Sequence, residues 1–200
     1  MIYWLGMAAV AVSAITGVLE AGRKPIDLFG MTLVALASAL GGGTIRDVLL
    51  DRPAFWIDDQ AYLVCALVAG VATFALVRLV RLPVNLFLIP DAIGLALFTV
   101  VGTQIALVWG VPWLAASLLG VVTGVVGGVL RDMLCNEVPL VFSGVLYGTA
   151  AWAGALAFIG LWRSGVQPGP ASLAAMAFIL VVRLAALKWN IGLPRFVARR

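Results

Sequence analysis

One short motif occurs twice in this chain and contains the residues whose types and spacing could do chemistry. It reads Gly-Gly-Gly-Thr-Ile-Arg-Asp at 41–47 and Val-Gly-Gly-Val-Leu-Arg-Asp at 126–132, an offset of 85 positions. Adjacent glycines weaken a helix and leave its carbonyl oxygens without side-chain cover, and such carbonyls can coordinate a cation. The motif therefore predicts two helix interruptions beside an ion path, at Gly41, Gly42, Gly43, Gly127 and Gly128.

Close helix packing is the alternative use of these glycines. Small residues at a spacing of four let membrane helices approach each other closely, and Gly120, Gly124 and Gly128 form such a row. We interpret this row as a packing surface and the adjacent pairs as part of a path. Both uses stay open for Gly128, which belongs to the row and to a pair.

Each copy of the motif ends in an Arg-Asp dipeptide, Arg46-Asp47 and Arg131-Asp132. Neighbours in sequence point in different directions on a helix, so we expect each arginine to pair with some other carboxylate. A single such arginine near a membrane surface is explained by a side chain that extends toward water. Two copies at equivalent places favour a structural or gating ion pair instead.

Asp91 is a carboxylate within an apolar segment, about two turns beyond the expected start of its helix. A carboxylate at such depth is costly and usually faces a cavity or a partner. Two interpretations stay open, a functional role on the path and a structural bond to a neighbouring arginine. At the offset of 85 positions its equivalent is Gly6, so this charge occurs in one copy only.

The composition of the chain predicts a membrane protein. Hydrophobic residues make up 64% of the 200 residues and charged residues 11%, which leaves too little polar surface for a globule in water. Long apolar runs in lipid form helices. The net charge of +4 comes from basic residues scattered singly, so no nucleic-acid partner is expected. The predicted spans are 2–20, 27–50, 61–80, 85–108, 112–134, 139–160 and 171–189.

The repeated motif divides these spans into two equivalent groups. Each group contains three spans, so the two copies insert with opposite polarity and form an inverted repeat. The predicted fold is all-α integral membrane, with seven transmembrane helices in two inverted three-helix repeats plus one C-terminal helix. The expected boundaries within this one structural domain are 1–82, 83–164 and 165–200.

The distribution of basic residues predicts the orientation. On this arrangement of spans, ten of the 13 Lys and Arg residues lie on the side of the C-terminus. Basic residues favour the cytoplasmic side of a membrane. We therefore expect a multi-pass protein of the inner (plasma) membrane, with its N-terminus outside and its basic C-terminal tail in the cytoplasm.

An enzymatic role is not expected for this chain. The sequence contains no histidine, which excludes His-based catalytic triads and His zinc sites. A G-x-S-G nucleophile motif and paired intramembrane aspartates are also missing. We expect no cofactor and no tightly bound metal.

The two motifs, together with Asp91-Ala92-Ile93-Gly94 and Glu137-Val138-Pro139, resemble those of the prokaryotic trimeric intracellular cation channel family. Its bacterial branch has also been labelled glycine-transporter-like or an uncharacterised membrane family. The resemblance covers residues 2–190 and implies seven helices in membrane lipid, a homotrimer, and one pore in each protomer. It also implies permeation of monovalent cations, chiefly K⁺, past kinks at Gly41–Gly43 and Gly127-Gly128.

Two positions depart from the family pattern. Val126 stands where many relatives have a third glycine, and Gly6 stands where an aspartate matching Asp91 is expected. The leading function is a passive cation channel. The alternative is a secondary transporter for a small zwitterion such as glycine, because inverted repeats with broken helices are also typical of transporters. Repeated charged residues argue against a mere packing scaffold.

A reporter fused after Arg200 tests the predicted orientation and the number of spans together. We expect activity from a reporter that works only in the cytoplasm, because an odd number of spans places the two termini on opposite sides. The measurement is reporter activity in intact cells. The control is a periplasm-specific reporter at the same position, and its activity there would contradict the seven spans and the inverted repeat.

Overall fold

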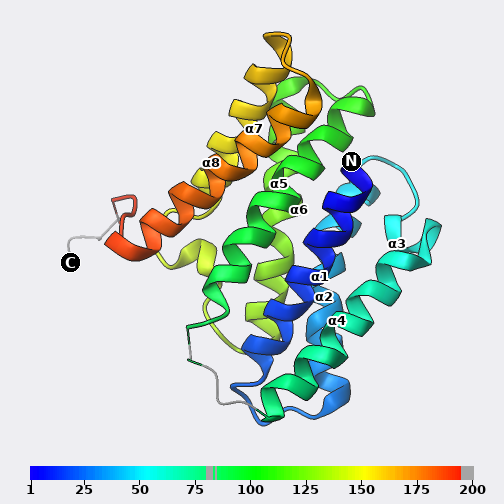
Figure 1. Ribbon diagram of the computed structural model, residues 1–200, viewed down its shortest axis with the longest axis vertical. Coiled ribbons are helices and arrows are strands. Elements are labelled where there is room, and N and C mark those ends of the chain that lie inside the picture. The colour runs from blue at the N-terminus through cyan, green and yellow to red at the C-terminus, as the bar shows by residue number, and fades with distance from the viewer. Residues whose placement is uncertain (80–82, 84, 195–200) are drawn as a thin grey trace, which may run out of the picture.

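Helices make up most of the described chain. The structure, a computed structural model, describes residues 1–79, 83 and 85–194, so the basic tail beyond Pro194 lies outside the described residues. In chain order (Figure 1) the elements are α1 (Ile2–Ala21), α2 (Leu28–Leu49), α3 (Phe55–Asp58), α4 (Gln60–Leu79), α5 (Leu88–Val108), α6 (Trp113–Leu134), the 3₁₀ turn η1 (Leu140–Phe142), α7 (Gly148–Arg163) and α8 (Pro168–Trp189).

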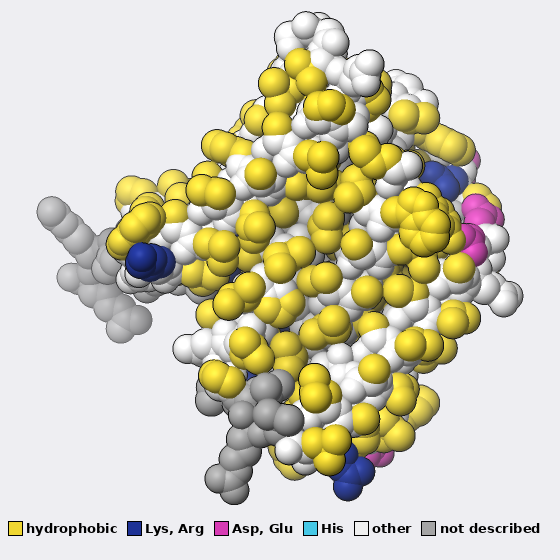
Figure 2. Space-filling model, viewed as in Figure 1, with side chains coloured by type: hydrophobic (Ala, Val, Ile, Leu, Met, Phe, Trp, Pro, Cys, Tyr) yellow, Lys and Arg dark blue, Asp and Glu magenta, His cyan; other side chains and the backbone are white. Residues whose placement is uncertain are grey.

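The chain is an all-helical membrane protein. Within the described residues, six helices are long and apolar enough to cross a membrane, namely α1, α2, α4, α5, α6 and α8. Hydrophobic side chains cover the visible face of the molecule, and charged side chains lie near its margins (Figure 2). Helix α7 has 16 residues, or roughly 24 Å at 1.5 Å per residue, which is shorter than a typical hydrocarbon core of about 30 Å. The seventh span therefore stays a prediction.

The predicted start of the span 139–160 is wrong, because α7 begins only at Gly148. The backbone before it is bound by the C-terminal part of the chain instead of by a helix. The Leu146 carbonyl accepts a hydrogen bond from Arg183 Nη1 at 2.9 Å. The Leu146 N–H donates to the Ile191 carbonyl at 3.0 Å. Non-helical backbone inside a membrane protein needs such partners, and here α8 and the residues after it supply them.

Four helices form the centre of the bundle. Helices α5 and α6 pack against each other, α1 and α2 pack against each other, and α1 contacts α5 while α2 contacts α6. Helix α4 covers α1 and α2, whereas α7 and α8 cover the other side of α5 (Figure 1). The α5–α6 and α7–α8 turns lie at one end of the molecule, and the α1–α2 loop lies at the opposite end.

The backbones of α2 and α6 touch where they cross. Gly42 of α2 lies against the backbone carbonyl of Thr123, and Gly127 of α6 lies against the backbone carbonyl of Ser38. Both glycines and both carbonyls are related by the offset of 85 positions. The crossing is therefore made of two equivalent contacts, and a side chain at either glycine would displace the facing helix.

The predicted interruption of these two helices is wrong. Helix α2 continues without a break through Gly41–Gly43, and α6 continues through Gly127-Gly128. Gly41 faces the Leu130 side chain and Gly43 faces the Phe55 ring. The neighbouring side chains fill the space beside the glycines. Tertiary packing therefore keeps this segment helical, although glycine has a low helix propensity in isolation.

Helices α2 and α6 also end in the same local structure. Asp51 and Asn136 follow them with φ angles of 51° and 54°. The next residue then bonds back to the helix, from Arg52 N to the Asp47 carbonyl at 3.1 Å and from Glu137 N to the Asp132 carbonyl at 2.8 Å. These matches agree with a duplicated unit. The opposite orientation of the two copies stays a prediction.

Alanine at the crossing tests the backbone contact. We expect Gly42→Ala and Gly127→Ala each to lower the apparent melting temperature in detergent by roughly 5 °C. Overpacking costs about 1–3 kcal/mol, and each kcal/mol is worth roughly 2–4 °C for a chain of this size. The control is Gly160→Ala, because no atom lies within 4 Å of a Cβ placed there. Equal stability of all three variants would contradict the contact.

Candidate functional site

Five buried side chains form a charged cluster at one end of α5 and α6. We call it the Arg131 cluster, and its members are Asp91, Arg131, Asp132, Tyr147 and Arg183. Arg131 lies at its centre, with Nη1 2.7 Å from Asp91 Oδ1 and Nε 2.8 Å from Asp132 Oδ1. Each of the five residues is at most 5% exposed. Charges buried this deeply require partners, and here α5, α6, the start of α7 and α8 contribute them.

Each arginine was expected to pair with a carboxylate other than its own aspartate, and this holds only in part, because both arginines bind their own aspartate and Arg131 binds Asp91 as well. Arg46 Nε donates to Asp47 Oδ1 at 2.8 Å, and Asp47 Oδ2 accepts from the backbone N–H of Phe55 at 2.9 Å. The turn after the helix thus fixes the carboxylate, and the long arginine side chain folds back to reach it. The same two bonds, with the same lengths, occur in the second copy between Arg131, Asp132 and Leu140.

Asp91 forms an ion pair with a neighbouring arginine, which is the structural one of the two roles expected for it. It lies in the first turn of α5, not two turns inside, and it binds Arg131. The Tyr147 hydroxyl donates to the same oxygen at 3.3 Å. A Cβ on Gly128 would lie 3.0 Å from that hydroxyl and 3.6 Å from Asp91 Oδ1. Gly128 therefore gives the cluster its room, whereas Gly120 and Gly124 pack on threonines of α5 as the row predicts.

Sequence reasoning missed Tyr147 and Arg183. The signal for Tyr147 was its equivalence with Tyr62 at the offset of 85 positions, and the signal for Arg183 was its place inside an apolar run. The Arg183 guanidinium lies 4.6 Å from the centre of the Tyr147 ring, a cation–π contact. It thereby joins α8 to the cluster.

Several polar atoms of the Arg131 cluster have no hydrogen-bond partner within the described part of the chain. They are Asp91 Oδ2, Arg131 Nη2, and Nε and Nη2 of Arg183. Unpaired buried donors and acceptors of this kind are expensive and bind water or ions where there is room. The cluster thus offers polar groups for solvent or for a passing ion.

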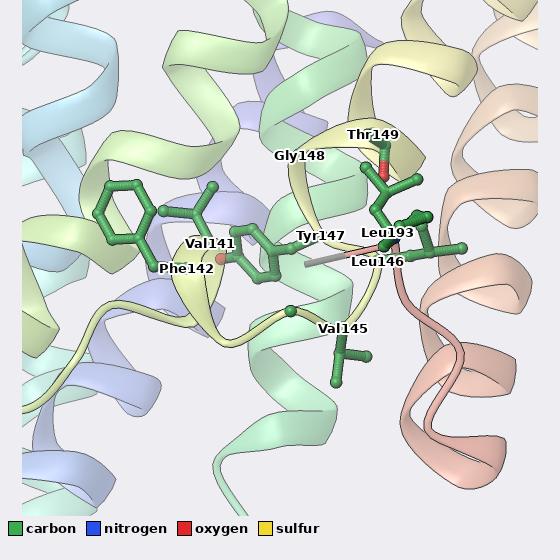
Figure 3. A pocket seen from close by; sticks show the side chains of 10 residues that line it. Val141, Phe142, Val145, Leu146, Tyr147, Gly148, Thr149 and Leu193 are labelled. Carbon is green, nitrogen blue, oxygen red and sulfur yellow. The ribbon is translucent and has the colours of Figure 1, made fainter. Parts of the chain in front are cut away.

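An apolar cavity of about 380 Å³ lies beside the cluster, and Tyr147 belongs to both. In Figure 3, Val141 and Phe142 lie on one side of the Tyr147 ring, and Leu146 and Leu193 on the other. In this segment the Leu146 carbonyl accepts a hydrogen bond from Arg183, and the Leu146 N–H donates to the Ile191 carbonyl. Arg183 of α8 therefore holds both the segment that lines the cavity and the Arg131 cluster.

A second charged cluster lies at the equivalent end of α2. We call it the Arg46 cluster, and its members are Arg46, Asp47, Arg52, Phe55 and Tyr62. Arg52 Nε lies 3.6 Å from Asp47 Oδ1. The Arg46 guanidinium lies 5.7 Å from the centre of the Phe55 ring, which packs edge-on against Tyr62. Each end of the α2–α6 pair thus carries a buried arginine held by its neighbouring aspartate.

Buried hydroxyl groups line the helices between the two clusters. Thr16 and Ser38 share a hydrogen bond of 3.3 Å across α1 and α2, and Thr103 donates to the Thr99 carbonyl within α5. Hydroxyl oxygens can serve as ligands for a desolvated cation. The buried serines and threonines of α1, α2, α5 and α6 are Ser13, Thr16, Ser38, Thr99, Thr103, Ser117 and Thr123.

Two equivalent contacts link the two halves at opposite ends. At one end Lys24 Nζ lies 2.7 Å from Glu137 Oε1, and its hydrogen bond holds the pKa of that carboxyl below its usual range. At the other end the Arg52 guanidinium lies 4.8 Å from the centre of the Trp109 ring. Both contacts join positions related by the offset of 85. The ionic contact is lost in acid as Glu137 is protonated, while the cation–π contact is not.

The comparisons with known proteins agree with this geometry. A family model described as Glycine transporter matches residues 3–78 and 88–163. The UPF0126 inner membrane protein YadS of Escherichia coli (strain K12) is 40% identical over 199 residues, covering 98% of this chain and 96% of that protein. The trimeric intracellular cation (TRIC) channel orthologue from Rhodobacter sphaeroides has a TM-score of 0.90 at 36% identity, covering 95% of this chain and 98% of that chain.

A further solved structure, concerned with conductance through TRIC cation channels, has a TM-score of 0.87 at 30% identity and covers 98% of this chain and 97% of its own. The two segments that match the family model are also offset by 85 positions, as the motif is. The resemblance stated from the motifs is thereby confirmed. The chain belongs to the family described as Glycine transporter, together with the UPF0126 membrane proteins, and has the fold of prokaryotic TRIC channels.

Proposed function

We propose that the protein is a channel for monovalent cations, chiefly K⁺, with one path through each protomer. The observation that carries this proposal is the match, over nearly the whole chain, to solved TRIC cation channels. The polar interior of the bundle supports it. Buried charged and polar side chains are costly in a membrane protein and usually mark an ion or substrate path.

The proposed path runs between α1, α2, α5 and α6, from the Arg46 cluster to the Arg131 cluster. At its middle, Gly42 and Gly127 touch the carbonyls of Thr123 and Ser38, so we take the described state to be closed. A small separation of α2 and α6 then frees two carbonyl oxygens and the hydroxyls of the same residues. Glycine at the contact suits this separation, because it has no side chain that could fill the gap between the two unbroken helices.

A homotrimer in membrane lipid is part of the proposal. The R. sphaeroides neighbour is named a trimeric channel. Large apolar side chains are exposed over α4 and α8, where lipid or a neighbouring protomer covers them; examples are Val64, Val68, Val71, Leu173 and Val181. We propose seven spans with the N-terminus outside, in keeping with the alternation of loops between the two ends of the molecule in Figure 1.

A secondary transporter for a small zwitterion is the second candidate, favoured by the description of the matching family. The two functions predict different measurements on purified protein. For the channel we expect discrete single-channel current steps in planar bilayers with K⁺ on both sides. Saturable glycine uptake into proteoliposomes without unitary current would support the carrier and contradict the channel.

Gly128→Ala tests the cluster's part in permeation. The new methyl group would lie 3.0 Å from the Tyr147 hydroxyl, so we expect it to displace that hydroxyl and cut K⁺ flux while the oligomer persists. The measurements are flux in proteoliposomes and size exclusion on the same preparation.

Two further variants complete this test. Gly43→Ala, at the equivalent position, should behave alike because its methyl group meets the Phe55 ring. Gly160→Ala is the control at an open position. Normal flux and normal assembly of Gly128→Ala would contradict a role for this residue in the path.

A further inference from the structure

The two charged clusters contain the same residue types at equivalent positions but differ in net charge. Three residue types recur at equivalent positions, in the pairs Arg46 and Arg131, Asp47 and Asp132, and Tyr62 and Tyr147. The fourth position differs, since it is aspartate at 91 and glycine at 6. One cluster thus has a carboxylate that the other lacks.

Gly6 and Asp91 each lie beside the tyrosine hydroxyl of their cluster. A Cβ on Gly6 would lie 3.2 Å from the Tyr62 hydroxyl, and the hydroxyl of Tyr147 lies 3.3 Å from Asp91 Oδ1. The Tyr62 ring packs against Phe55 with 4.9 Å between ring centres, and Phe55 in turn contacts Arg46. A carboxylate at position 6 would therefore enter the Arg46 cluster, as Asp91 enters the other one.

The missing carboxylate leaves the Arg46 cluster one positive charge in excess. Asp47 is the carboxylate shared by both arginines, with Arg46 at 2.8 Å and Arg52 at 3.6 Å. Arg52 Nε is buried and has no hydrogen-bond partner within the described residues. The Arg131 cluster, in contrast, balances two arginines with two aspartates.

We propose that this excess charge makes the Arg46 cluster a valence filter, with Gly6 as the position that sets it. The inference rests on the proposed cation channel. A fixed positive charge repels an ion in proportion to the ion's own charge, so a divalent cation meets twice the barrier of a monovalent one. K⁺ therefore passes at a modest cost, and Ca²⁺ is held back.

Nearby carboxylates do not cancel this effect. Asp51, after α2, and Asp58, the last residue of α3, are exposed, and Asp59 is half-buried. Charges in contact with water are screened within about 8–10 Å at physiological salt, whereas buried charges are screened much less. The surface aspartates concentrate cations of both valences at the mouth, and the less exposed excess charge of the Arg46 cluster discriminates between them.

Gly6→Asp tests the inference. We expect the permeability ratio of Ca²⁺ to K⁺, measured from reversal potentials in planar bilayers, to rise roughly tenfold. This is the effect of one unit charge about 10 Å from the ion at an effective dielectric constant of about 20. Gly6→Asn is the matched control, because it adds the same volume without the charge. Gln60→Glu adds a carboxylate at an exposed position nearby and controls for surface potential.

Arg52→Gln also removes the excess charge. It therefore tests the inference even where Gly6→Asp does not assemble. Its side chain is 21% exposed, so we expect a shift in the same direction but smaller. An unchanged ratio in both variants, with K⁺ current intact, would overturn the valence filter and leave the channel standing. An equal shift in Gly6→Asn or Gln60→Glu would also overturn it. Absence of K⁺ current from the unaltered protein would overturn the channel, and the filter with it.

Discussion

The contact between the backbones of α2 and α6 is the constraint on which the rest of the structure depends. Gly42 and Gly127 let the two helices meet at carbonyl distance, and this meeting fixes how the first three-helix group lies on the second. It also brings Ser38 and Thr123 to the centre of the bundle, where their hydroxyls are buried. Any side chain at either glycine moves one half of the molecule relative to the other.

The charged clusters fix the ends of the same two helices. Each aspartate of the Arg-Asp dipeptides bonds its arginine with one oxygen and the following turn with the other. A carboxylate bound on both sides cannot rotate away, so the arginine is held as well. A buried ion pair stabilises only when its remaining polar atoms are also bonded. Tyr147 meets this condition in part, since its hydroxyl bonds Asp91 Oδ1, whereas Asp91 Oδ2 and Arg131 Nη2 have no hydrogen-bond partner within the described residues.

The sequence predicted what depends on neighbouring residues and missed what depends on distant ones. The spans 27–50 and 112–134 match α2 and α6 within one residue at each end, because long apolar runs are local signals. The predicted helix breaks failed because glycine propensity yields to packing by another helix. The late start of α7 depends on Ile191, more than forty positions away. The spacing argument did not predict that each arginine also binds its own aspartate. Both dipeptides lie near helix ends, where a backbone N–H beyond the turn binds the aspartate and holds it within reach of the arginine.

Helix α8 contributes a residue, Arg183, to the Arg131 cluster and none to the Arg46 cluster. It has no counterpart in the first three-helix group, and it buries Arg183 against Tyr147 beside the second copy of the motif. A buried guanidinium requires a carboxylate nearby, and Asp91 supplies it by joining α5 to Arg131. The first copy receives no such helix, and its second arginine, Arg52, is instead 21% exposed beside Asp47. The cluster that α8 joins is thus the one that has Asp91, and the net charge falls from one positive charge in the Arg46 cluster to zero in the Arg131 cluster.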